Sequence, residues 1–191
     1  MRSPVAAFLV RCLLWLVPCY AAWFLASAAW TRIVAWIALP FIRLFHPELA
    51  SGMEIAGSDI SFVTALTVHT PTGAEGLLVP DVDARTYTHG LPLFLALMLA
   101  SRARWSGIAI GAAVLIPVHA WGIAFDLLAQ IIRMGPEIAA RAGLAGPSAN
   151  AVALGYQAGS LIFPVLAPVV LWVVFNAKFL RELRSPAAVA P

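Results

Sequence analysis

Long apolar stretches alternate with short polar connections along most of the chain. Residues 5–29 are enough, at about 1.5 Å per helical residue, to cross about 30 Å of hydrocarbon. Residues 106–133 and 151–175 are long enough as well. Residues 90–101 are fewer, and approach a span of about 17 residues only when the flanking positions 88–105 are included. The pattern predicts an all-α membrane protein with about four transmembrane helices.

The first apolar stretch also has features of a signal peptide. Arg2 and Arg11 would form its basic region, and Ala26-Ser27-Ala28 a small-residue cleavage site. However, the apolar run starts before Arg11, and Pro18 is unusual in a signal core. We therefore expect a retained helix, with cleavage near residue 29 as the alternative.

The polar pattern between the first two apolar stretches predicts an extracytoplasmic segment. Residues 30–45 are amphipathic and are expected to lie as a helix along the membrane surface. Residues 60–70 are rich in Val, Thr, Ile and Phe, and with residues 76–82 they flank a turn over residues 70–75. This arrangement predicts a small β-hairpin.

Charge sets the expected orientation. The basic residues at the ends and in one short connection lie on one side, which the positive-inside rule assigns to the cytoplasm: Arg2, Arg102, Arg104, Lys178, Arg181 and Arg184. Seven of the nine acids fall on the other side: Glu48, Glu54, Asp59, Glu75, Asp81, Asp83 and Glu137. Both termini are then cytoplasmic. The expected parts are a first transmembrane helix over residues 1–29, an outer segment over 30–88, transmembrane helices 2–4 over 89–177, and a cytoplasmic tail over 178–191.

Composition agrees with a bilayer protein and excludes a soluble domain. Sixty-two per cent of the 191 residues are hydrophobic and 11% are charged, and the mean hydropathy is +0.90, whereas soluble domains have about a quarter of their residues charged. The net charge is only +3, and no basic stripe is interleaved with aromatic residues. Nucleic acid is therefore not an expected partner.

Four polar residues in the third apolar stretch share one helical face. His119, Asp126, Gln130 and Arg133 are spaced i, i+7, i+11 and i+14, which places them within a stripe of about 60°. Asp126 and Arg133 lie about two turns apart, and a pairing through Gln130 or water is expected to neutralise both. Ionisable residues at membrane depth are functional candidates. The alternative is that the stripe only forms structural hydrogen bonds between helices, with the two amides of the fourth helix, Asn150 and Gln157, as its partners.

A helix-entry motif precedes the second span. Tyr87 and His89 stand just before Gly90, and Pro92 follows in the first turn, where a missing N–H does no harm. In the fourth span, Pro164 and Pro168 share the face of the two amides on an ideal helix, and we expect a kink there.

Catalytic and metal-binding signatures are absent from the sequence. There is no phosphate loop, no nucleophile elbow and no pair of histidines on one helical turn, so neither a cofactor nor a metal site is predicted. Cys12 and Cys19 lie about 10 Å apart on the first helix and cannot bridge each other. A thiol enzyme would require Cys19 to meet a base such as His119.

The chain resembles the exosortase H-associated membrane proteins in several segments. The segments that carry the likeness are Tyr87-Thr88-His89-Gly90-Leu91-Pro92, His119-Ala120-Trp121-Gly122-Ile123-Ala124-Phe125-Asp126 and Ala153-Leu154-Gly155-Tyr156-Gln157. Residues 11–19 are similar too, and the region of residues 48–85 matches least. Exosortases are multi-spanning, transpeptidase-like enzymes of Gram-negative inner membranes that process C-terminal sorting tails with a Cys, Arg and His set.

The resemblance implies a multi-pass protein of the inner membrane that accompanies an exosortase-type enzyme. It implies no catalytic residue, because the enzyme's motif does not map onto this chain. The expected function is that of a non-catalytic accessory subunit, which binds the enzyme or its substrate tail. Two alternatives are a small thiol enzyme built on Cys19 and His119, and a lipid or small-solute binding or transport protein that uses His119, Asp126 and Gln130.

Overall fold

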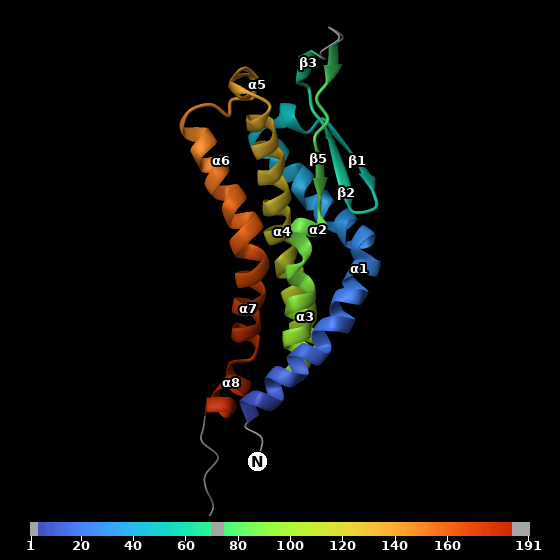
Figure 1. The fold of residues 1–191 in the computed structure, drawn as a ribbon, viewed down its shortest axis with the longest axis vertical. Helices are drawn as coiled ribbons and strands as arrows, with labels where there is room; N and C mark the ends of the chain where they lie inside the picture. Colours follow the sequence, from blue (N-terminus) through green and yellow to red (C-terminus); the bar gives the residue numbers. More distant parts are fainter. Residues whose placement is uncertain (1–3, 70–74, 185–191) are drawn as a thin grey trace, which may run out of the picture.

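The computed structural model describes residues 4–69 and 75–184. It is mostly helical (75%) with a small amount of sheet. The elongated molecule carries its strands at one end and both ends of the described chain at the other (Figure 1). The main helices are α1 (Pro4–Phe45), α3 (Gly90–Ala100), α4 (Trp105–Arg133), α6 (Pro147–Gln157) and α7 (Phe163–Phe175). The short helical elements are the 3₁₀ turn η1 (Pro47–Leu49), α2 (Arg85–Thr88), α5 (Pro136–Arg141), the π-helical turn η2 (Ala158–Ile162) and α8 (Ala177–Arg184).

Helix α1 is a single element of 42 residues. At about 1.5 Å per residue it is about 63 Å long, roughly twice the hydrocarbon thickness. The separate amphipathic helix predicted over residues 30–45 is not confirmed, because these residues continue α1 with no break at Trp30. One face of this part of α1 is buried, and Val34, Ala35 and Ala38 have no exposed surface, whereas Ile33 and Ile37 on the outward side stay exposed. Apolar residues therefore lie both on the face that packs against the protein and on the face that points outward.

Five strands form two small antiparallel sheets. The first has the order β1 (Gly52–Ala56), β2 (Asp59–Val63), β5 (Asp81–Asp83), and the second pairs β3 (Thr67–His69) with β4 (Glu75–Leu77). The β2–β5 and β3–β4 pairings confirm the predicted hairpin, whose turn at residues 70–74 lies outside the described residues. Two differences from the prediction are the extra strand β1 and the interruption at residues 64–66. There, hydrogen bonds from the N–H of Thr64 to Leu78 O and from the N–H of Leu78 to Leu66 O continue the pairing.

The helices after the sheets fall close to their predicted positions. Helix α4 covers the third predicted span, and α6, η2 and α7 cover the fourth without a gap, while α5 lies in the connection between these two spans. Helix α8, an eight-residue helix, occupies the start of the predicted tail. Residues 185–191 of this tail lie outside the described residues.

The π-helical turn η2 changes the faces of the fourth span. A π turn inserts about one extra residue into the helix, which rotates everything beyond it by roughly 100°. Pro164 and Pro168 are buried, whereas Asn150 and Gln157 are exposed. The prediction that these prolines and amides share a face is therefore wrong. The expected irregularity near Pro164 is present and takes the form of this π turn.

Two hydrophobic cores divide the molecule along its length. One joins the C-terminal half of α1, the sheet and the second half of α4 through Leu49, Ile60, Phe62, Ile123 and Leu127. The other joins α1, α3, α4 and α7 at the opposite end through Phe8, Phe94, Met98, Leu115 and Trp172. Trp30 packs against both cores. The sheet is thus attached directly to the helices.

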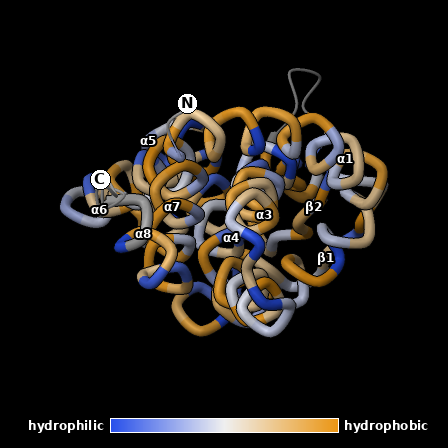
Figure 2. Tube along the Cα trace, turned by 90° about the horizontal axis from the view of Figure 1, so that it is seen from below, coloured by the Kyte–Doolittle hydropathy of each residue, from blue (hydrophilic) through white to orange (hydrophobic). Residues whose placement is uncertain are grey.

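Three helical stretches within the described residues are long and apolar enough to cross a membrane: Pro4–Phe45, Trp105–Arg133 and Pro147–Phe175. Helix α3, with 11 residues, is about 17 Å long and falls short of a full span. A count of four spans is therefore not confirmed. Seen along its long axis, the molecule carries apolar residues on its outward as well as its inward helix faces (Figure 2).

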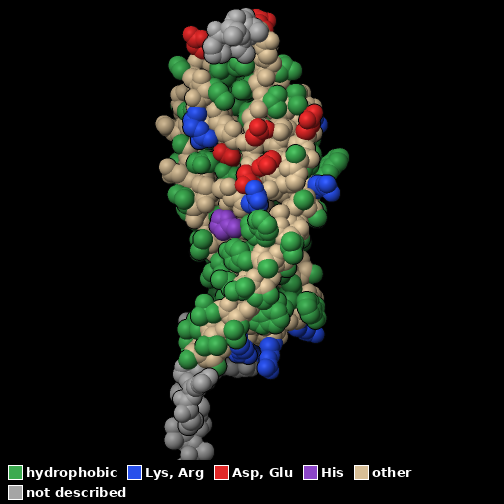
Figure 3. All heavy atoms as spheres, turned by 45° about the vertical axis from the view of Figure 1, so that its right-hand side comes forward, with side chains coloured by type: hydrophobic (Ala, Val, Ile, Leu, Met, Phe, Trp, Pro, Cys, Tyr) green, Lys and Arg blue, Asp and Glu red, His purple; other side chains and the backbone are tan. Residues whose placement is uncertain are grey.

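The two ends of the molecule differ in charge. In the face drawn in Figure 3, the acidic side chains lie over the strand-bearing part together with several basic ones, whereas basic side chains alone are seen at the opposite end, which we call the basic end. A long, mostly uncharged section lies between them. The α3–α4 connection lies at the basic end together with α8 (Figure 1).

Candidate functional site

The most polar part of α4 lies near its C-terminal end, where three side chains meet. Arg133 Nη2 lies 3.5 Å from Asp126 Oδ1, and Gln130 Nε2 donates to Asp126 Oδ2 at 3.2 Å. Spacings of three and four residues bring side chains together on one helix face. The predicted neutralisation of Asp126 by Arg133 and Gln130 is therefore present. The Asp126 side chain is only 13% exposed.

Two tyrosines from other elements complete this group. Tyr87 of α2 is 3% exposed, and its pKa is raised because burial excludes water and because Asp126 and Tyr156 interact with its hydroxyl by charge and hydrogen bonding. The ring of Tyr156, on α6, lies 5.6 Å from the Arg133 guanidinium, a cation–π distance. We call Asp126, Gln130, Arg133, Tyr87 and Tyr156 the polar cluster.

The polar cluster also contacts the sheet. Gln130 Nε2 donates to the carbonyl oxygen of Asp81 in β5 at 2.9 Å. Just after Asp81, Arg85 Nε lies 3.1 Å from Asp83 Oδ1. The pKa of Arg85 is raised, mainly because its side chain donates this hydrogen bond to Asp83. Gln130 of α4 therefore holds β5, the edge strand that precedes α2, against the membrane helix.

His119 has a different environment from the rest of the predicted stripe. It is 1% exposed, and its Nδ1 accepts a hydrogen bond from Trp30 Nε1 at 3.2 Å. Its Nε2 has no hydrogen-bond partner among the described residues. The structure thus pairs His119 with α1, while Asp126, Gln130 and Arg133 face α2 and α6.

The two amides of the fourth span are turned outward. Asn150 and Gln157 are exposed, and the described residues offer neither side chain a hydrogen-bond partner. Gln157 borders a hollow of about 230 Å³ together with Arg133 and Tyr156. The amides therefore do not join Asp126. Sequence reasoning missed Tyr156, whose ring lies beside the Arg133 guanidinium. The two residues are on different helices, and the helical period of α4 alone does not show that they meet.

The helix-entry motif acts through close packing. Helix α2 ends at Thr88, α3 begins at Gly90, and Pro92 lies in the first turn, as predicted. A Cβ at Gly90 would lie 2.5 Å from the Pro164 carbonyl oxygen, so only glycine permits this approach of α3 to α7. The His89 carbonyl oxygen accepts from the Tyr20 hydroxyl at 3.3 Å. The motif fixes α3 between α1 and α7.

The structure does not bring Cys19 to His119. Cys19 is buried beside Leu95, Trp105 and Ile108, whereas His119 contacts Trp30. Trp30 is eleven residues from Cys19 on α1, which corresponds to about 16 Å of helix. Within the described residues, no group of three or more His, Cys, Asp or Glu side chains could hold a metal ion.

Comparison with known proteins gives one match. A family model described as exosortase H-associated membrane protein matches residues 2–179, nearly the whole chain. No curated protein matches, and no solved structure matches.

Proposed function

The chain belongs to the family of exosortase H-associated membrane proteins, and from this premise we propose that it is a non-catalytic partner of an exosortase-type sorting enzyme. It binds the enzyme or its substrate tail inside the membrane, and the sheet lies at the outer opening. It is a multi-pass protein of the Gram-negative inner membrane, with both termini in the cytoplasm.

The observation that carries this proposal is the exposed side chain of Gln157. It is the eleventh of the 29 residues of the helical stretch Pro147–Phe175, about 15 Å along a helix of about 43 Å. A bilayer of about 30 Å centred on this helix therefore has Gln157 within its outer half. An amide that faces lipid without a hydrogen bond is costly, and such residues commonly bond to a neighbouring membrane helix. A partner helix on α6 satisfies Gln157, and Asn150 extends the same contact toward the outer surface.

The polar cluster has a supporting part in this proposal. Its carboxylate is already paired and largely buried, so it is not a free surface for a partner. Instead, it ties α4, α2, α6 and β5 together and gives the exposed face of α6 a fixed shape. The binding surface is therefore the outward side of α6.

Co-expression with the exosortase tests the proposal. Purification in a mild detergent should recover the enzyme with the wild-type chain, and Gln157→Leu should lower the recovered enzyme about fivefold, the factor expected from an interhelical hydrogen bond of about 1 kcal/mol. Leu25→Val, on α1 and 84% exposed in the wild type, lies outside this surface, so it is the control and should not change recovery. Equal recovery with wild type, Gln157→Leu and the Asn150→Leu/Gln157→Leu double variant would place the contact elsewhere. Failure of the wild-type chain to retain exosortase would contradict the proposed partnership.

A further inference from the structure

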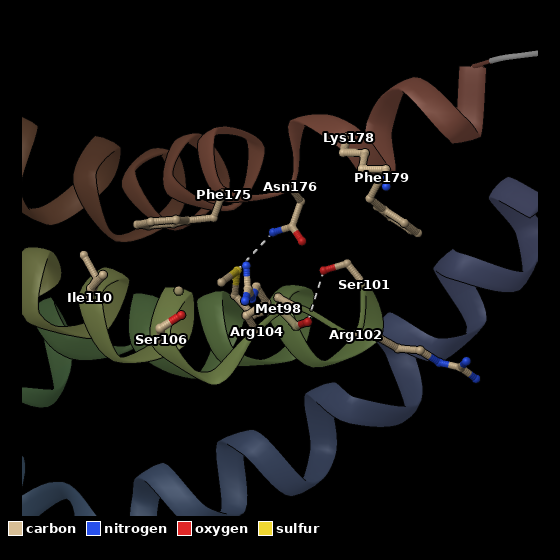
Figure 4. Close-up of a pocket in the computed structure, with 12 residues that line it drawn as sticks. Met98, Ser101, Arg102, Arg104, Ser106, Ile110, Phe175, Asn176, Lys178 and Phe179 are labelled. Atoms are coloured by element: carbon tan, nitrogen blue, oxygen red, sulfur yellow. Dashed lines mark hydrogen bonds between the residues drawn. The ribbon is translucent and has the colours of Figure 1, made fainter.

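A hollow of about 450 Å³ lies at the basic end of the molecule, where α3 ends, α4 begins and α7 passes into α8 (Figure 4). This volume is in the range of small-molecule sites. One part of its wall is basic, with Arg104 and Lys178, and another part is apolar, with Ile110, Phe175 and Phe179. We call it the basic pocket.

The cations of the basic pocket come from two different helical segments. Figure 4 shows Arg104 extending from the start of α4 toward α7, with Lys178 on the α8 side, while Arg102 points away from the hollow. None of the residues that line the pocket is acidic. The positive charge is therefore not neutralised from within the pocket, and an anion placed between α4 and α8 would meet both cations.

The start of α4 adds to this positive potential. Ser106, in the first turn of this 29-residue helix, lines the pocket. The first N–H groups of a helix have no partner within the helix, and together with the helix dipole they attract anions. Three independent sources of positive potential, two side chains and one helix end, thus converge on one hollow.

The position of the pocket identifies the source of the anion. It lies at the end of the apolar stretch Trp105–Arg133, next to Trp105, which is 77% exposed. Tryptophan is enriched where lipid headgroups meet the hydrocarbon. A free phosphate ion has no apolar part that could contact Ile110, Phe175 and Phe179. A phospholipid does, because its first acyl carbons lie close to its phosphate.

We propose that the basic pocket binds the headgroup of an anionic phospholipid, with Arg104 and Lys178 on the phosphate oxygens and the first acyl carbons against Phe175. Phosphate groups form charge-assisted hydrogen bonds with such cations. Bound lipid joins the start of α4 to α8 and fixes the height of this end of the molecule in the membrane.

Native mass spectrometry of the delipidated protein tests this inference. Added phosphatidylglycerol should remain bound, phosphatidylcholine of the same acyl chains should not, and Arg104→Gln should lower phosphatidylglycerol retention by about tenfold, in line with the loss of a charge-assisted contact. Ser106→Asp should have a similar effect, because it puts a negative charge into the pocket. An acid in the first turn favours the helix, so this variant should unfold no earlier than wild type.

Arg11→Gln is the matched control, since Arg11 is on α1 and does not line the pocket. Equal loss of phosphatidylglycerol in Arg11→Gln and Arg104→Gln would show a nonspecific charge effect and overturn the proposal. Unchanged retention in Arg104→Gln and Ser106→Asp would overturn it as well. If inorganic phosphate bound as strongly as phosphatidylglycerol and displaced it, the pocket would be a site for free phosphate and not for lipid.

Discussion

Asp126 is stabilised at the scale of single residues by groups that each satisfy one part of its carboxylate. Arg133 pairs with one oxygen and Gln130 donates to the other, while the phenol of Tyr87 lies close by. An ionised carboxylate at membrane depth would otherwise be costly. Removing it takes the carboxylate away from the buried Tyr87 hydroxyl and from Arg133, and that loss exceeds what the pair itself contributes.

The first prediction is that Asp126→Leu destabilises the protein strongly and Asp126→Asn mildly. Leucine removes the carboxylate beside the buried Tyr87 hydroxyl and leaves Arg133 without its ion pair, at a cost of about 1–3 kcal/mol for a buried polar group, whereas asparagine keeps one oxygen. Gln130 keeps the Asp81 carbonyl oxygen as its acceptor in both variants. Thermal unfolding in detergent and the amount of protein in the membrane measure the effect. If both variants matched wild type, the polar cluster would have no stabilising role.

The second prediction concerns alkaline pH. The pKa of Tyr87 is raised above its ordinary value of 10.0, because burial and Asp126 disfavour the phenolate. Its contribution to stability is therefore fully present below about pH 10 and is lost as the pH rises above that value, where the unfolded chain releases this proton and the folded chain retains it. Unfolding midpoints between about pH 9 and 11 should fall less steeply for Tyr87→Phe than for wild type. Equal slopes would contradict the prediction.

The third prediction concerns the cysteines. A nucleophilic thiolate requires a nearby base or cation and access to water, and Cys19 lies buried next to Leu95, Trp105 and Ile108. Cys12→Ala and Cys19→Ala, alone or together, should leave protein levels and processing of the exosortase substrate within about twofold of wild type. Loss of processing in both Cys19→Ala and His119→Ala, at normal protein levels, would instead establish a thiol enzyme.

Sequence spacing predicted those contacts that lie within one helix. Asp126, Gln130 and Arg133 meet because the helical period alone brings them together. Tyr87 and Tyr156 come from α2 and α6, and no local pattern shows which residues of other elements face α4. The same limitation applies to His119, whose partner Trp30 is 89 residues away.

At the scale of elements, glycines decide how closely the helices approach. A Cβ at Gly159 in η2 would lie 2.7 Å from the Gly122 Cα, so the backbones of η2 and α4 are in near contact. The space beside Gly122 on its other side is filled by the ring of Tyr87. Small residues permit such contact between membrane helices, and here they allow α2, α4 and η2 to meet.

The fourth prediction is that Gly159→Ala destabilises the protein although alanine favours helix. The added methyl group meets backbone, which cannot move aside, and overpacking of this kind costs about 1–3 kcal/mol. Gly107→Ala is the control, because its Cβ would meet the end of the Met98 side chain at 3.3 Å, and it should be neutral or stabilising. Thermal unfolding of the two variants gives the comparison. Gly159→Ala that unfolds no earlier than Gly107→Ala would exclude a tight η2–α4 contact.

The predicted elements were correct where the period was uniform and wrong where tertiary contacts set the boundary. The length of the apolar run over residues 106–133 predicted α4 to within one residue. Residues 30–45 carry apolar side chains both on a buried face, as at Val34, and on an exposed face, as at Ile37, and their pattern did not show that they continue the first helix. Strand β1 has only five residues, of which Glu54 is charged, and it forms through its pairing with β2. The rotation at η2 follows from a π turn, which a 3.6-residue period does not contain.

At the scale of the whole molecule, the proposed orientation rests on the uneven distribution of charge. Both ends of the described chain and the α3–α4 connection lie at the basic end, and the strand-bearing end with the acidic side chains lies opposite (Figures 1 and 3). Three candidate spans separate the two ends. Three crossings alone would place the two ends of the chain on opposite sides of a membrane. Both ends of the described chain lie at the basic end, so a fourth segment, which includes α3, must return the chain from the sheet to that end. With residues 85–100, α2 and α3 bring the chain from the sheet back to the basic end, about 24 Å of helix.

The fifth prediction is that both termini lie in the cytoplasm and the sheet lies outside. Lys and Arg in short connections are retained on the cytoplasmic side, and Arg102, Arg104 and Lys178 all stand at the basic end. A reporter fused after residue 184 should be active only if it functions in the cytoplasm, and one inserted within residues 70–74 only if it functions outside. The opposite result at the C-terminus would mean that α3 does not return the chain, and the basic pocket would then face the outer leaflet. Helix α3, helix α4 and the stretch from α6 to α7 lie between the two fusion sites. The sites are therefore on opposite sides of the membrane only if α3 completes a crossing in addition to the other two.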